Sequence, residues 1–305
     1  MKLRYVVSVA SVLGAILSFH LQQEAKANVA DDLNTNYNKV IDNCGSENSP
    51  GYLCSGNIVR YANATTNYHA WDPSPKSIER GGVSFIYLRK DVNYSKQVNT
   101  TGGQTTGMIF YPPEQKPQTK SNVETSCIFP IDGWSDTRPD GGCGVSTAYP
   151  KTSQRCQEQN IYTAEEWHQH FTNNDVSGYG IFEHQCAFDV SNCGHNTADA
   201  FIQSIKAHNM VYDTSSAYPQ YGSNEVVVKT PATSANGQTT NPEVLPLQAF
   251  FYIDTTGLTE AQKYQQDYYN ITGQFVPVVY MNTTNFDNIS FKYQAADQVV
   301  LKSAN

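Results

Sequence analysis

Charge is scarce in this sequence, and the charge patterns that would indicate two common kinds of partner are missing. Only 16% of the residues are Asp, Glu, Lys or Arg, and the net charge is −8. The chain has no polybasic run, so it lacks both the basic face that nucleic-acid binding needs and the segment that holds proteins on anionic lipid. Beyond residue 27, no apolar run is long enough to cross a bilayer. We therefore expect no nucleic-acid partner and no stable membrane anchor.

The signatures of several enzyme classes are missing as well. The sequence has no Gly-x-Ser-x-Gly elbow, no P-loop and no dinucleotide-binding glycine fingerprint. None of its cysteines lies in a recognisable nucleophile motif. An α/β-hydrolase, a P-loop nucleotide hydrolase and a Rossmann dehydrogenase are therefore not indicated.

The N-terminus carries the pattern of a cleavable secretory signal peptide. Lys2 and Arg4 precede an apolar run over residues 5–19, and Ala25 and Ala27 form a small-x-small cleavage site. Cleavage after residue 27 would leave 278 residues with a net charge of −10. We expect a secreted or periplasmic protein in which residues 28–305 form a single domain, with its core at about 44–285.

Seven cysteines lie beyond the predicted signal peptide, which predicts three disulfides and one thiol in an oxidising compartment. The sequence does not determine the pairing, but short loops favour Cys44–Cys54 and Cys186–Cys193. An alternative is a zinc site formed by Cys186, Cys193 and the histidines two residues outside them. Because that spacing matches no familiar zinc motif, we expect no metal and no cofactor. The cysteines are Cys44, Cys54, Cys127, Cys143, Cys156, Cys186 and Cys193.

Short apolar, β-branched and aromatic runs outnumber helical patterns, which predicts an α+β fold that is mostly β. Thr163 with Glu166 forms a capping-box pattern at the start of one expected helix. Residues 230–242 are polar and are expected to form a loop. The expected helices span 31–41, 163–171 and 197–208, with one helical turn at 77–82, and the expected strands span 57–61, 83–88, 225–230, 247–253 and 274–281.

The order of four segments resembles the mono-ADP-ribosyltransferases of the cholera- and pertussis-toxin type. In that family an arginine lies on an early strand, a Ser-Thr-Ser strand follows, and a glutamate begins a later strand. The matching segments here are residues 58–61 with Arg60, 75–82, 144–147, and 221–228 with Glu225. The resemblance implies a split β-sandwich with flanking helices, here stabilised by disulfides.

Longer stretches resemble the halovibrin family of secreted bacterial proteins, members of which are NAD glycohydrolases. This resemblance covers roughly residues 44–281 and implies that NAD⁺ is a substrate rather than a bound cofactor. The matching stretches are residues 54–60, 68–75, 81–89, 129–132, 249–252 and 268–277.

The two resemblances imply roles for matching residues. Glu225 would bind the ribose 2′-OH of NAD⁺ and stabilise the positive charge that builds on the ribose as the N-glycosidic bond breaks. Arg60 would pair with the pyrophosphate through its planar guanidinium. The hydroxyl of Ser146 would hold Glu225 in position, and Ser84 is its rival for that role.

Further residues of the resemblance would contact the substrate, and one departs from the transferase pattern. Thr147 would lie beside the serine, and Tyr218 or Tyr221 would stack on nicotinamide. Transferases carry Glu or Gln two residues before the catalytic glutamate, whereas this chain has Ser223. Because serine cannot deprotonate an acceptor, hydrolysis is favoured over protein ADP-ribosylation. A non-catalytic glycan- or surface-binding protein is the alternative from another class, suggested by the Tyr and Trp content.

Overall fold

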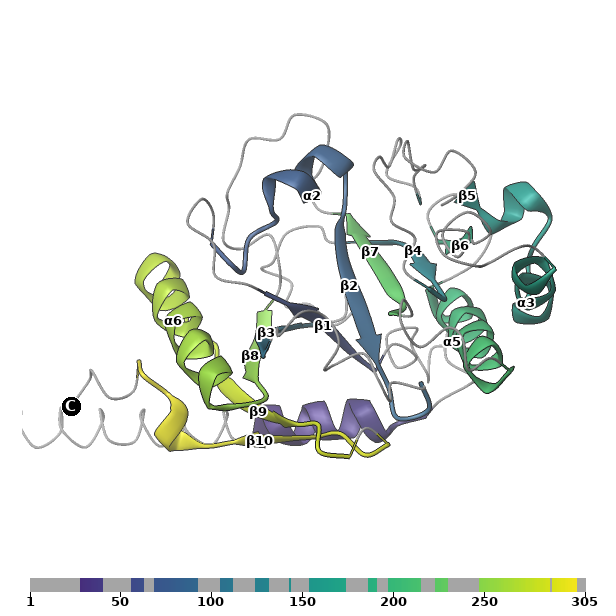
Figure 1. Cartoon of the computed structure of the whole chain (residues 1–305). Coiled ribbons are helices and arrows are strands. Elements are labelled where there is room, and N and C mark those ends of the chain that lie inside the picture. Colours follow the sequence, from purple (N-terminus) through teal and green to yellow (C-terminus); the bar gives the residue numbers. More distant parts are fainter. Residues whose placement is uncertain are drawn as a thin grey trace, which may run out of the picture.

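The computed structural model describes residues 28–40, 56–62, 69–92, 105–111, 124–131, 143, 154–173, 186–190, 197–214, 223–229, 247–285 and 287–300. These residues form an α+β fold that is mostly sheet (Figure 1). Ten strands follow the order β10-β9-β8-β3-β1-β2-β7-β4-β6-β5. The strands are β1 (Asn57–Tyr61), β2 (Val83–Leu88), β3 (Thr106–Phe110), β4 (Glu124–Phe129), β5 (Gln154–Arg155), β6 (Cys186–Asp189), β7 (Glu225–Lys229), β8 (Leu247–Tyr252), β9 (Val278–Asn282) and β10 (Ser290–Tyr293).

Strand β2 joins the two halves of this sheet. Its second half pairs with β1, from Leu88 opposite Asn57 to Ile86 opposite Val59. Its first half pairs with β7, where Val83 lies opposite Val228. The neighbouring pairs are antiparallel except β8–β9 and β5–β6, which are parallel. In Figure 1, β2 is therefore the long central strand, with β1 crossing its lower half and β7 beside its upper half.

Helices flank both halves of the sheet. The helix α6 packs on β8, β3 and β9, while α5 packs on β4 and β6 and contacts α3 (Figure 1). The residues of the buried core come from most of the described chain, the first being Ala30 and the last Phe291. No helix in the described part of the chain is both long enough and apolar enough to span a membrane. The helical segments are residues 28–38, α2 (Pro75–Arg80), η4 (Cys156–Gln159), α3 (Ala164–Thr172), α5 (Thr197–Thr214), α6 (Thr255–Thr272) and η6 (Ala295–Asp297).

The expected elements around the candidate site are confirmed. Strands β1 and β2 have the predicted bounds, and β7 begins at Glu225 as expected. The helix α3 begins with the predicted capping box, in which the Thr163 side chain accepts from the Glu166 amide and the Glu166 carboxylate accepts from the Thr163 amide. The helix expected over 197–208 continues to Thr214.

One predicted disulfide is wrong. Cys186 is bonded to Cys156 rather than to Cys193, because the parallel pairing of β5 with β6 brings residues 154–155 beside residues 186–187. Cys156 follows directly and its Cα lies 4.9 Å from that of Cys186. The sulfur of Cys186 is therefore unavailable to the alternative zinc site. Cys44, Cys54 and Cys193 lie outside the described residues.

Candidate active site

A buried carboxylate and a hydroxyl meet on the two strands at the centre of the sheet. Glu225 begins β7 and is 4% exposed. On β2, Ser84 lies opposite Val227, so Glu225 is its diagonal neighbour on the same face. The Ser84 hydroxyl donates a hydrogen bond to Glu225 Oε1. Because the Ser84 side chain is solvent-exposed, this pair lies at the surface of the sheet.

Asn224 fixes the backbone just before Glu225. Its buried side-chain amide accepts from the Tyr87 N–H at 2.9 Å and donates to the Tyr87 carbonyl at 3.1 Å. The Asn224 side chain thus replaces a backbone partner for Tyr87, two residues beyond the last β2–β7 backbone pair. The Tyr87 hydroxyl is in turn 2.9 Å from the Ser204 hydroxyl of α5. These contacts tie the start of β7, and with it Glu225, to β2 and to α5.

Arg60 lies on β1, the strand on the other side of β2. Its side chain is half-buried, and its backbone lies opposite Met108 of β3. The next pair, Tyr61 with Gly107, needs a glycine, because a Cβ on residue 107 would lie 2.2 Å from the Arg60 carbonyl oxygen and 2.6 Å from the Phe251 ring. This close approach of β3 fixes the position of the Arg60 backbone in the sheet.

The register of β1 separates Arg60 from the face of Ser84. Val59 lies opposite Ile86, which shares a face of β2 with Ser84. Since successive residues of a strand point to opposite faces, Arg60 belongs to the other face of a regular ladder. However, β1 pairs with β2 only as far as Val59 and continues along β3 to Tyr61. Arg60 is therefore the first residue beyond the point where β1 leaves β2.

The remaining residues implied by the resemblances lie outside the described part of the chain. These are Ser146, Thr147, Tyr218 and Tyr221. Among the residues expected to act on NAD⁺, the structure thus brings Ser84 and Glu225 into direct contact and places Arg60 one strand away. The serine that bonds to Glu225 within the described residues is Ser84, the rival candidate.

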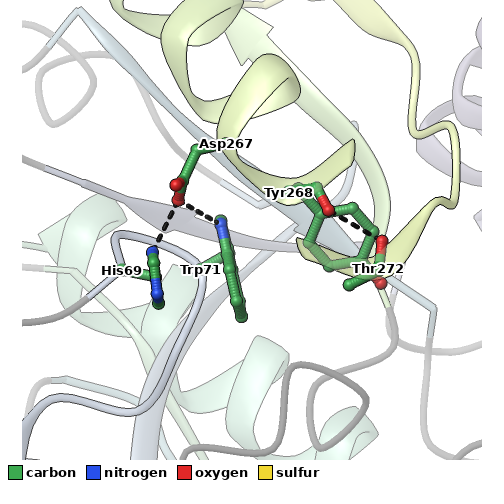
Figure 2. Close-up of polar contacts among 5 residues, drawn as sticks. All are labelled: His69, Trp71, Asp267, Tyr268 and Thr272. Carbon is green, nitrogen blue, oxygen red and sulfur yellow. Dashed lines mark hydrogen bonds and ion pairs between the residues drawn. The ribbon is translucent and has the colours of Figure 1, made fainter. Parts of the chain in front are cut away.

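A second polar cluster holds the connection between β1 and α2 against α6. Figure 2 shows the side chains of His69 and Trp71 directed at Asp267 of α6. Asp267 Oδ2 lies 2.7 Å from His69 Nδ1 and accepts from Trp71 Nε1 at 3.1 Å. The two rings are stacked with their centroids 4.5 Å apart, and Trp71 meets the edge of Tyr268 at 5.2 Å. The Asp267 carboxylate thus holds both rings, and with them residues 69–71, against α6.

Asp72 is a buried carboxylate in this second cluster. It is 2% exposed, and its Oδ2 has no hydrogen-bond partner among the residues that the structure describes. Burial raises the pKa of Asp72 to about 6; His69 lowers it and Asp267 raises it by smaller amounts. A carboxylate that gains a proton near pH 6 beside a histidine can exchange protons under mild conditions.

Sequence reasoning missed four of these residues: Asn224, His69, Asp72 and Asp267. His69 and Asp72 lie close together in the sequence, but the contact of His69 with α6 has no local signal because Asp267 is almost 200 residues away. Asn224 had a sequence signal, since this asparagine directly precedes the predicted strand that begins at Glu225.

No family model matches the chain, and neither curated proteins nor solved structures gave a match. Within the described residues, no group of three or more His, Cys, Asp or Glu side chains is arranged to hold a metal ion.

Proposed function

We propose that this chain is a secreted NAD⁺ glycohydrolase of halovibrin type, with an ADP-ribosyltransferase-like split β-sandwich. It would cleave the bond between nicotinamide and ribose with water. The observation that carries the proposal is the hydrogen bond from Ser84 to Glu225, at the start of the strand where the toxin-type enzymes have their catalytic glutamate. Strand β2, whose two halves pair with different strands, supports the split architecture.

Glu225 supplies the catalytic interaction in this proposal. As the C1′–N bond breaks, nicotinamide leaves with the bonding electrons and the ribose becomes oxocarbenium-like. A carboxylate that accepts a hydrogen bond from the ribose 2′-OH binds more tightly as that charge develops, which lowers the barrier. Water then adds to C1′ and releases a proton. A carboxylate has about four lone-pair positions, so Glu225 can accept from Ser84 and from the ribose together.

Arg60 binds the pyrophosphate in this proposal. The point where β1 leaves β2 is where a split sandwich opens between its halves, and Arg60 is the first residue beyond it. From there a flexible side chain can turn toward the substrate although the ladder assigns it to the other face. A guanidinium pairs with phosphate oxygens through two parallel hydrogen bonds, which a lysine cannot reproduce. Arg60→Lys should therefore raise the KM for NAD⁺ markedly while the free energy of unfolding stays close to wild type.

Hydrolysis is favoured over transfer to a protein. Ser223 occupies the position of the acceptor-activating Glu or Gln of the transferases. Its short hydroxyl cannot act as a base, so water is the default acceptor. Incubation of labelled NAD⁺ with a cell lysate tests this choice, and label on proteins would contradict it.

The placement of the aromatic side chains gives the sugar-binding alternative less support. Trp71 and Trp167 are 2% and 0% exposed, so neither presents a ring face to a glycan. The exposed aromatic side chains of the described residues, Tyr162 and Tyr269, lie far apart in the sequence. Selective binding on a glycan array without turnover of NAD⁺ would reverse this preference.

The decisive experiment measures nicotinamide release from NAD⁺ by the oxidised protein without residues 1–27. Glu225→Gln keeps the shape of the side chain and removes its charge, so we expect a loss of roughly a hundredfold or more in kcat. Glu260→Gln on α6, where the Glu260 side chain is partly exposed and pairs with Lys263, is the matched control and should keep wild-type activity. Equal activity in Glu225→Gln and wild type would move the active site elsewhere, and a folded wild type without activity would refute the proposal.

The same assay identifies the serine that positions Glu225. Ser84→Ala removes the hydrogen bond to Oε1 and should reduce kcat by roughly tenfold or more, with little change in KM. Ser146→Ala is the parallel variant. A full loss in Ser146→Ala together with wild-type activity in Ser84→Ala would assign the role to Ser146.

A further inference from the structure

Two buried cysteines share a small apolar cluster beside the β4–β7 pair. Cys127 lies on β4, opposite Val227 of β7. Cys143 lies outside the regular strands, and both side chains are 0% exposed. The cluster consists of Cys127, Phe129, Cys143, Ala187 and Val227. Residues 16 positions apart in the sequence thus meet in one closed pocket of the core.

The two sulfur groups are direct neighbours. Both residues are present as thiols, and the Cys143 thiol makes a side-chain hydrogen bond with Cys127. Burial raises the pKa of the Cys143 thiol well above its usual value, and the nearby Cys127 raises it further. Asp189 also raises the pKa of the Cys143 thiol and Arg155 lowers it, so these two charged residues lie near the cysteine pair.

A disulfide already crosses this region of the fold. Cys156 is bonded to Cys186 at the start of β6, and the next residue, Ala187, belongs to the cluster around Cys127 and Cys143. Disulfides persist in oxidising compartments, so a chain that carries this one folds where thiols are oxidised. Two further thiols in contact under the same conditions are expected to be oxidised as well.

We propose that Cys127 and Cys143 form a second disulfide in the mature protein. Each thiol loses its proton and the pair gives up two electrons as the S–S bond forms. A disulfide oxidant, such as oxidised glutathione or a dithiol–disulfide oxidoreductase, accepts the two electrons and two protons and is reduced to two thiol groups. The exchange takes place while the chain folds, before the cluster closes around the sulfurs.

This disulfide would anchor Cys143 to the strand that supports the candidate active site. Cys127 is two residues from Phe129, and Phe129 lies directly opposite Glu225. The link would therefore fix the environment of β7 from the side opposite β2. The inference depends on the cysteine geometry and not on the proposed activity, so each can fail without the other.

Peptide mapping tests the proposal on protein unfolded and alkylated without a reductant. Trypsin alone leaves both cysteines on residues 121–151, but trypsin with a protease that cleaves before Asp yields 121–131 and 140–151. We expect these two peptides joined and separable by reduction. The joined pair 156–174 and 175–188 reports the Cys156–Cys186 bond as an internal control. Alkylation of both Cys127 and Cys143, or a link from either to another cysteine, would overturn the proposal.

A single substitution gives opposite results for the two states of the pair. If the disulfide forms, Cys127→Ser leaves Cys143 without its partner, and the number of alkylatable thiols rises by one. If both residues are thiols in the wild type, the same substitution lowers that number by one. The count is made on unfolded protein, so the result holds even where the variant folds poorly, and a decrease would refute the disulfide.

Discussion

The buried carboxylate of Asp72 should make the protein less stable above pH 6 than below pH 4. Its pKa in the folded protein is about 6, against an ordinary value of 3.8. An acid whose pKa is raised by folding favours the folded state while it is protonated, and this contribution is lost as the pH rises through about 6. Two pKa units at 1.36 kcal/mol each correspond to a loss of about 3 kcal/mol between pH 4 and pH 8.

Asp72→Asn removes this cost because the amide stays neutral at every pH. We expect the variant to match the wild type near pH 4 and to exceed it by up to ~3 kcal/mol in free energy of unfolding at pH 8. For a domain of this size, that difference is a rise in Tm of roughly 6–12 °C. Urea denaturation across pH 4–8 measures it.

Asp287→Asn is the control, because that carboxylate is exposed and its neutralisation should change stability by less than about 0.5 kcal/mol. An Asp72→Asn variant that is less stable than the wild type at pH 8 would refute the reasoning. It would mean that the ionised carboxylate is stabilised by an interaction stronger than its desolvation cost.

Three further substitutions test the packing that positions the candidate site. Gly107→Ala places a Cβ against the Arg60 carbonyl oxygen, which cannot move without breaking the β1–β3 ladder, so we expect a loss of ~3 kcal/mol in a urea denaturation experiment. Asn224→Ala strips the partners from two buried backbone groups and should cost about 2–4 kcal/mol, with a fall in kcat for NAD⁺ cleavage in the fraction that stays folded. Replacing Cys156 and Cys186 together by Ala opens a loop of 30 residues and should lower the free energy of unfolding by about 3–4 kcal/mol; no change on calorimetry would contradict the chain-entropy argument.

The central strands could be predicted from the sequence because their local signals agree. Residues 85–88 alternate aromatic and aliphatic side chains shortly after a Gly-Gly pair, and residues 225–229 contain three consecutive valines. Glu225 and Ser84 could therefore be placed on strands. That the strands are neighbours could not be predicted, since it depends on pairing between segments 141 residues apart.

The helix α6 was missed for a specific physical reason. Its caps are ordinary: Asp254 accepts from the Gly257 amide at 2.7 Å, and Gly273 ends the helix with φ of 67°. Its buried face, however, consists of Gly257, Ala261, Tyr264, Gln265 and Tyr268, with no Leu, Ile, Val or Met among them. Gln265 can be buried because its amide donates to the Val276 carbonyl and to Gln298. A pattern based on apolar residues does not register such a face.

The predicted Cys186–Cys193 disulfide is wrong because that prediction used loop length alone. A short loop lowers the entropic cost of closure, which favoured Cys186 with Cys193. The sheet decided otherwise, since the register of β5 with β6 brings Cys156 beside Cys186 across a separation of 30 residues. Tertiary pairing outweighed a preference worth about one kcal/mol.

The wide sequence separation of Ser84 and Glu225 has a consequence for the newly made chain. Their hydrogen bond closes a loop of 141 residues, and β3 gains its second neighbouring strand only when β8 has been added beside it. A sheet built from such distant segments folds slowly, over milliseconds to seconds. During synthesis, which adds about 5–20 residues per second, the contact between Ser84 and Glu225 cannot form until residue 225 has emerged. Under the proposed function, a chain that crosses a membrane unfolded would therefore leave the producing cell before the proposed cleavage of NAD⁺ could begin there.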